Sequence, residues 1–239
     1  MRALGIALAV LVSLVIGALG WALQIGLPAC FNQDPTPAIC DDYGLTGKSR
    51  ASRMSKIIRE EMAPVLADQK VRALHTADTK KAQAIGRELG SRGIVRLEDS
   101  DLDTWNGLRV AFADHSQKAC AGLASGQLDE ATLYEAMDSI PEPDARAWMR
   151  IAGKAMLAEV HQKNPWTPDE KAIEEGLTVI VKAMNEDEQA KFFEAAEKVD
   201  TRRADANEQC DVFKTLARGA QSMEPRLRRR FLRETARVP

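Results

Sequence analysis

A stretch without charged residues runs from Ala3 to Gln33 and sets the first constraint on how this chain folds. Residues 3–27 consist almost entirely of Ala, Leu, Val, Ile and Gly. An α-helix rises about 1.5 Å per residue, so about 20 residues cross a bilayer core of about 30 Å. The sequence therefore predicts a transmembrane signal-anchor over residues 1–28, with residues 3–27 in the membrane.

Two other interpretations of this segment remain open. Ala18-Leu19-Gly20 offers a small-residue cleavage site for a signal peptide. The apolar regions of signal peptides are usually about 7–15 residues long, however, and this one continues as far as Leu27. The stretch from Leu27 to Cys30 loosely resembles a lipobox, in which Cys30 would carry lipid, although Pro28 and the long run before it argue against this.

The charges on either side of the segment predict its orientation. Arg2 precedes it, whereas the first charges after it are acidic and the next basic residue is Lys48. Basic residues favour the cytoplasmic side, so we expect a single-pass protein of the inner (cytoplasmic) membrane with residues 30–239 exported, in a bacterium to the periplasm. Small residues at every fourth position also offer a face on which two spans can pack as a homodimer. These are Gly5, Ala9, Ser13 and Gly17.

Four cysteines fit an oxidising compartment, where an even number predicts disulfides. We expect Cys30 to pair with Cys40 in a juxtamembrane linker over residues 29–48, and Cys120 to pair with Cys210 between two distant helices. The chain-entropy model assigns these bonds about 3 and about 4.5 kcal/mol. A zinc site is the weaker interpretation of the first pair, because zinc ligands usually lie two to four residues apart.

Residues 49–239 are predicted to form one all-α exported domain, a multi-helix antiparallel bundle-like body braced by disulfides. One helix is expected to be capped by Ser100 and to continue through Leu123 before Gly126, and another to open at Thr167-Pro168 and run to Met184. The helix over residues 50–62 is expected to stop near Pro64. The other expected helices cover residues 78–89, 129–139, 143–162, 186–199 and 203–220, with a last basic helix after Pro225.

No motif predicts a cofactor, a metal site or a catalytic residue. The acidic run at 98–103 fails as a calcium loop starting at Asp99, because Thr104 and Val110 occupy its glycine and glutamate positions. It is better explained as an acidic first turn that complements the helix dipole. The histidines form no metal-binding or catalytic pair, and His115 is expected to be buried and hydrogen-bonded. They are His75, His115 and His161.

The last 16 residues, 224–239, separate charge from apolarity most clearly, with six arginines against two glutamates in a chain of formal net charge −2. Met223, Leu227 and Phe231 fall on one side of the predicted helix. The arginines are expected either to pair with an acidic body or to bind an anion, such as a lipid headgroup or an acidic partner. The candidates are Arg226, Arg229, Arg230 and Arg233.

Two classes of function follow as hypotheses. The first is a membrane-tethered periplasmic interaction domain, an adaptor, inhibitor or immunity-type protein that binds another envelope protein. The alternative is a cell-envelope enzyme, such as a cell-wall hydrolase, with a carboxylate pair in a cleft between helices. The balance of 33 basic and 35 acidic residues does not predict a nucleic-acid partner.

Overall fold

The computed structural model describes residues 50–74, 79–125, 130–201 and 203–236. Within these residues every regular element is helical, which confirms the predicted all-α class and multi-helix bundle. None of the helices in these ranges is long and apolar enough to cross a membrane. The predicted signal-anchor at 1–28, its small-residue face, and Cys30 and Cys40 lie outside the described residues.

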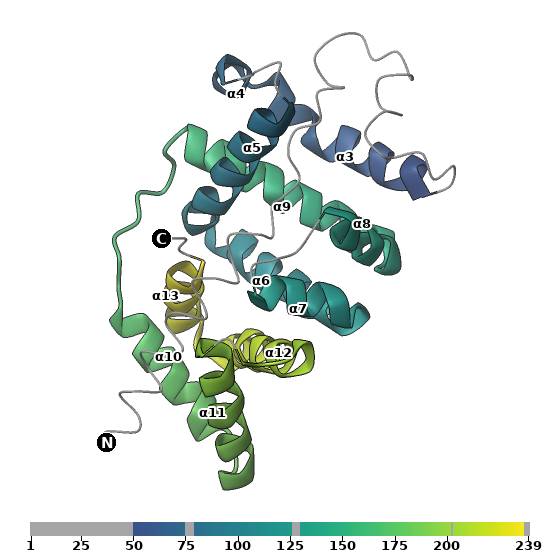
Figure 1. Cartoon of the computed structure of the whole chain (residues 1–239). Coiled ribbons are helices and arrows are strands. Elements are labelled where there is room, and N and C mark those ends of the chain that lie inside the picture. Colours follow the sequence, from purple (N-terminus) through teal and green to yellow (C-terminus); the bar gives the residue numbers. More distant parts are fainter. Residues whose placement is uncertain (1–49, 75–78, 126–129, 202, 237–239) are drawn as a thin grey trace.

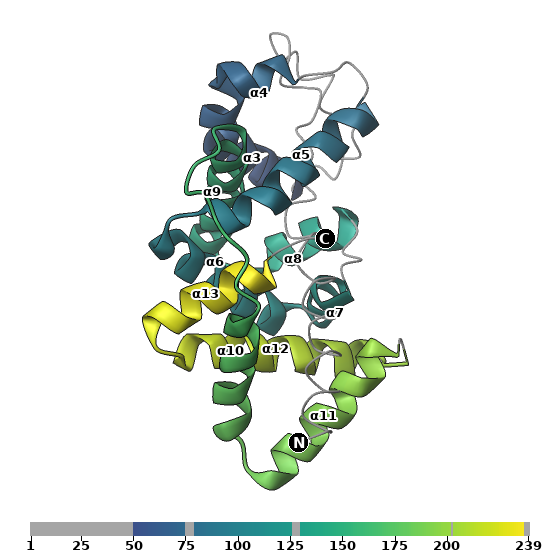
Figure 2. The ribbon, with the colours of Figure 1, turned by 90° about the vertical axis from the view of Figure 1, so that its left-hand side faces the viewer.

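The molecule is elongated in both orientations, with different helices at its two ends (Figures 1 and 2). The first end contains α3 (Arg50–Ala67), α4 (Gln69–Ala73), α5 (Thr79–Gly93) and α9 (Glu142–Val160). The middle contains the 3₁₀ helix η2 (Ile94–Arg96), α6 (Asp99–His115), α7 (Gln117–Ser125) and α8 (Glu130–Ser139). The second end contains α10 (Lys171–Lys182), α11 (Glu186–Asp200), α12 (Ala206–Ser222) and α13 (Pro225–Thr235).

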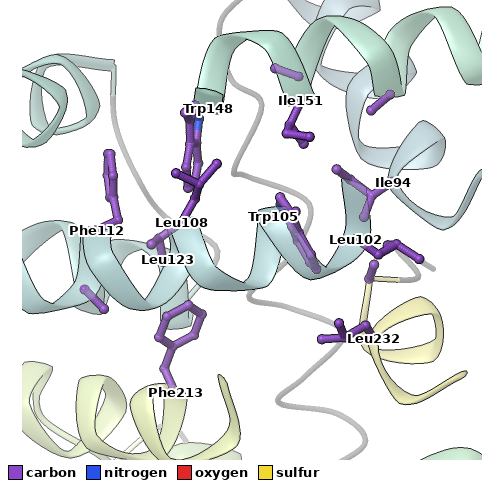
Figure 3. Packing of buried hydrophobic residues seen from close by; sticks show 14 of the residues in the cluster. Ile94, Leu102, Trp105, Leu108, Phe112, Leu123, Trp148, Ile151, Phe213 and Leu232 are labelled. Atoms are coloured by element: carbon purple, nitrogen blue, oxygen red, sulfur yellow. The ribbon is translucent and has the colours of Figure 1, made fainter. Parts of the chain in front are cut away.

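Helix α6 is the centre of the core, because it packs against α7, α8, α9, α12 and α13. Figure 3 shows α6 between α9, which carries Trp148, and α12, which carries Phe213. Trp105 and Phe112 of α6 are almost fully buried, and the Phe112 ring stacks on Trp148 with centroids 4.7 Å apart. Burying each large apolar side chain contributes about 1.5–3 kcal/mol. Because α6 packs on α9 at one end and on α12 and α13 at the other, it joins both ends of the molecule into one core.

The predicted Cys120–Cys210 pairing is confirmed. The bond joins α7 to α12 with the two Cα atoms 5.2 Å apart, and both side chains are fully buried. Because the cysteines are 90 residues apart, the bond closes a long loop between two helices that already pack on α6.

Two predicted helix boundaries at prolines are wrong. Helix α3 passes through Pro64 and ends at Ala67. Pro64 lies on the exposed face, where water can solvate the Glu60 carbonyl that loses its hydrogen bond, so the proline is tolerated. Helix α10 begins at Lys171 instead of Pro168, and the backbone N–H of Asp169, just before it, donates to the Glu234 carboxylate of α13.

The helix predicted from Ser100 through Leu123 is two helices. Its first part, α6, begins earlier than expected, because the Glu98 carbonyl already accepts the N–H groups of Asp101 and Leu102. Ser100 therefore lies inside the first turn and is not the cap. The helix then breaks at Ser116, whose hydroxyl accepts the Ala119 N–H at 3.1 Å at the start of α7.

Helix α5 approaches α9 so closely that only glycine fits at one contact. A Cβ atom on Gly93 would lie 1.8 Å from the Ala155 carbonyl oxygen. The helix predicted over residues 78–89 extends further, because α5 continues through Gly90 and ends at Gly93. Gly93 is used for contact between helices as well as for termination.

Candidate functional site

The C-terminal helix α13 docks on the body through its apolar side, as one of the two sequence interpretations expected. Phe231 and Leu232 are buried and Leu227 packs against the same core. A Cβ atom on Gly176 of α10 would lie 2.3 Å from the Phe231 ring, so the glycine makes room for this ring. Glu224 caps the helix by accepting the first N–H groups of α13.

The arginines of α13 point to acidic residues of the body. Arg233 donates to the Val95 and Leu97 carbonyls at 3.1 and 2.9 Å and to Asp99 at 2.9 Å. Arg229 also pairs with Asp99, at 2.9 Å. Arg230 contacts the carboxylates of Asp169 and Glu175, at 2.7 and 2.9 Å, and these contacts raise its pKa. Arg226 is exposed.

The acidic run at 98–103 is the main receiver of these charges. Besides the two arginines on Asp99, Arg228 binds Asp103 with two hydrogen bonds of 2.8 and 3.1 Å. Lys154 of α9 contacts Asp101 at 2.6 Å. Asp99 and Asp101 lie in the first turn of α6 and complement the helix dipole as expected, and Asp99 and Asp103 hold α13 in place.

The histidines occupy surface positions where the structure describes them. His115 was expected to be buried, but it is exposed and its Nδ1 lies 2.8 Å from the Ala111 carbonyl. It is the last residue of α6, so it lies beyond the core along the axis although its angular position matches Phe112. His161 contacts Asp68 at 2.7 Å, and His75 lies outside the described residues.

An open groove lies at the second end of the molecule, where α10, α11 and α12 form the sides of a triangle in Figure 2. Its volume is about 630 Å³. The floor is apolar and combines residues of all three helices. They are Ile180, Met184, Phe192, Ala195 and Val212. We define this hollow as the α10–α12 groove.

Local sequence explains why the groove forms here. A Cβ atom on Gly219 of α12 would lie 2.5 Å from the Ile180 side chain, so this glycine lets α10 rest on α12 at one edge. Asn185 then caps α11 with a capping box that includes Glu188, which turns the chain sharply after α10. Asp205 and Glu208 form the same box at the start of α12. The two caps therefore fix where α11 and α12 begin.

Charged side chains line the rim of the α10–α12 groove. The Lys198 ammonium lies 2.6 Å from Glu208 and 2.9 Å from Glu194, so it joins α11 to α12. The two carboxylates raise the pKa of Lys198, and Lys198 in turn lowers the pKa of Glu208. Arg218 contacts Asp114 of α6 at 2.6 Å. Asp211 is exposed at the same rim.

The Arg109 guanidinium of α6 is a charged group buried in the hydrophobic core. Arg109 is only 6% exposed and lies 4.4 Å from the Trp105 ring centroid and 4.7 Å from that of Phe213. None of the ion pairs among the described residues includes it. Burial lowers the pKa of Arg109 to about 9, so it stays a cation at neutral pH. The two aromatic faces are its electrostatic partners.

The described residues contain no group of three or more His, Cys, Asp or Glu side chains placed to hold a metal ion. Comparisons of the chain with protein-family models, with curated proteins and with solved structures found no match. The functional proposal therefore depends on the geometry of the α10–α12 groove and of α13.

The sequence did not predict the α10–α12 groove or the position of Arg109. The helical pattern places Phe192 and Ala196 on one face of α11, but the same pattern arises whether that face is fully covered or partly open. Helix α10 gives no clearer signal, because its charged residues, Lys171, Glu174, Glu175 and Lys182, and its buried apolar residues fall on separate faces. Val179 of this helix is exposed at 36%.

Proposed function

We propose that the chain is a membrane-tethered helical interaction domain that binds another envelope protein in the α10–α12 groove. The observation that carries the proposal is the groove itself, an open hollow of about 630 Å³ with an apolar floor and a charged rim. Open apolar surface of this kind marks sites where a helix of a partner can dock its apolar face.

The carboxylates of the groove are arranged for ion pairing. Glycoside hydrolysis requires a carboxyl group with a raised pKa as the acid, facing a second carboxylate. Here Glu194 and Glu208 share the Lys198 ammonium, and the pKa of Glu208 is lowered. This arrangement favours the interaction domain over the envelope hydrolase, which remains the alternative hypothesis.

The proposed function includes a membrane tether and a location in the periplasm. Residues 3–27 would hold the domain at the inner membrane, with the helical body in the periplasm. Support comes from the Cys120–Cys210 bond, because disulfides persist in oxidising compartments.

The groove is a better candidate for partner binding than α13. The contacts of Arg229, Arg230 and Arg233 with carboxylates of the body already compensate much of their charge. Anion or partner binding by these residues and Arg226 stays a prediction.

Site-specific crosslinking in native membranes tests the proposal. A photoreactive amino acid replaces Ala183, which is exposed and lines the groove, and in a matched variant replaces Ala190, which is exposed on α11 outside the groove lining. We expect one discrete protein adduct at Ala183 that an excess of unlabelled full-length domain competes away, and no such adduct at Ala190. Equal, non-competed labelling at the two positions, or none at Ala183, would overturn the proposed function.

A further inference from the structure

We infer that the segment docked in the α10–α12 groove is a basic amphipathic helix of the partner protein. This inference rests on the proposed function and adds the chemistry of the partner. Two independent features carry it, namely the shape of the floor and the charge of the walls.

The floor fits the apolar stripe of a helix. Ile180 and Phe192 are at most 6% exposed, while Met184 and Ala195 are half-buried and keep part of their apolar surface accessible. A helix presents apolar side chains at three- and four-residue intervals, which is the spacing at which it contacts a groove of this kind. The volume of about 630 Å³ accommodates several such side chains.

The walls of the groove are weakly acidic. The lining contains four acids, Glu188, Glu194, Glu208 and Asp211, against three bases, Lys191, Lys198 and Arg218. The main rim cation, Lys198, is already neutralised by its two glutamates. Among the described residues, no ion pair involves the lining residue Asp211, which is exposed. Its charge is available to a cationic partner.

The second rim cation does not reverse this balance. Arg218 is held by Asp114, which lies outside the groove on α6. Lys191 is the remaining basic residue of the lining, which also contains Glu188 and Asp211. Charges of opposite sign steer association and disfavour partners of the same sign, so the rim selects a segment rich in Lys and Arg.

The test uses two synthetic amphipathic peptides, each about four helical turns long, with identical leucine stripes. One carries lysine on its polar face and the other carries glutamate. Each is titrated against the full-length protein in nanodiscs of zwitterionic lipid, with empty nanodiscs as the control for membrane binding. We expect only the lysine peptide to bind, and its affinity to fall at least about tenfold from 0.05 M to 0.5 M salt, because screening weakens exposed charges.

Substitutions then locate the binding. Ala183→Trp fills the groove from an exposed position and should abolish binding, whereas Ala190→Trp should leave it unchanged. Asp211→Asn should weaken binding severalfold, and Glu174→Gln, an exposed acid of α10 outside the groove lining, should not. Circular dichroism of each variant confirms that the fold is intact.

The outcomes separate the inference from the proposed function. Binding of the glutamate peptide in preference to the lysine peptide, blocked by Ala183→Trp, would overturn the basic partner and leave groove docking in place. If neither peptide binds but a competed adduct forms at Ala183 in membranes, the basic partner is likewise overturned and groove docking stays in place. Failure of both peptides without that adduct would overturn the two proposals together.

Discussion

Replacement of the buried Arg109 by methionine should stabilise the protein. Arg109 lies between the rings of Trp105 and Phe213 and is 6% exposed. Methionine keeps an unbranched side chain of similar reach and removes the charge, so it can fill the same space between the rings. A buried charge without a carboxylate partner is costly, and replacement by an apolar side chain often raises stability.

The expected change in the free energy of unfolding follows from two opposing contributions of the guanidinium, its lost solvation and its contacts with the two rings. Burial lowers the pKa of Arg109 from 12.5 to about 9. At about 1.4 kcal/mol per pH unit this corresponds to about 5 kcal/mol of lost solvation. Two desolvated cation–π contacts return about 2 kcal/mol each. The balance is about 1 kcal/mol against the guanidinium, and the added burial of methionine raises the expected gain of Arg109→Met to about 1–3 kcal/mol.

The assay is urea unfolding followed by far-UV circular dichroism, with thermal melting as a second measurement. At about 2–4 °C per kcal/mol for a domain of this size, Arg109→Met should raise the melting temperature by several degrees. Arg109→Lys is the control, because it keeps a charge but loses the planar group that stacks on both rings. It should be less stable than the parent protein.

A loss of more than about 1 kcal/mol in Arg109→Met, with Arg109→Lys unchanged, would refute this reasoning. That result would mean that the charge itself is stabilised in the folded protein by a group other than the two rings.

Three further predictions concern the disulfide, the glycines and pH. Cys210→Ala should lower the free energy of unfolding by about 4.5 kcal/mol for a closed loop of 90 residues, and a denaturant curve that matches the parent protein would contradict this. Gly107→Ala should stabilise by about 1 kcal/mol, because its Cβ meets nothing within 4 Å, whereas Gly93→Ala should destabilise strongly, as differential scanning calorimetry of the pair can show. The hydrogen bond from His161 lowers the pKa of Asp68 below 3.8, so its stabilisation is present above that pH and is lost as pH falls through the lowered value. Asp68→Asn keeps the helix cap, so melting curves should show it less stable than the parent at pH 6, with the difference shrinking as the pH falls below 3.8.

The helices could be predicted from sequence because their signals are local. The cap at Asn185 with Glu188 three residues later marks the start of α11, and the structure confirms it. The start of α10 was not predicted correctly, because the helix begins at Lys171 although Pro168 suits a first helical position. The N–H of Asp169 donates to Glu234, 65 residues further along the chain, a contact that no local pattern indicates.

The candidate site shows the same division. Sequence predicted that Cys120 and Cys210 pair, since both fall on or beside apolar stripes. For the arginines of α13 the sequence allowed two interpretations, pairing with the body or binding an anion. Pairing depends on which acidic residues of the body lie opposite α13 in the folded protein. Asp99 meets Arg233 only through the packing of α6 on α13. The α10–α12 groove depends on the angle between helices, which no local pattern specifies.

The contact of Arg233 with the carbonyls of Val95 and Leu97 has a consequence for synthesis in the cell. The donor and its acceptors are 138 and 136 residues apart, so a nascent chain cannot make this contact until α13 has been translated. Before then, the surface that Phe231 covers beside Gly176 stays open to chaperones and proteases. Chains that end prematurely before Pro225 would keep that surface exposed, so quality control can distinguish them from chains that carry α13.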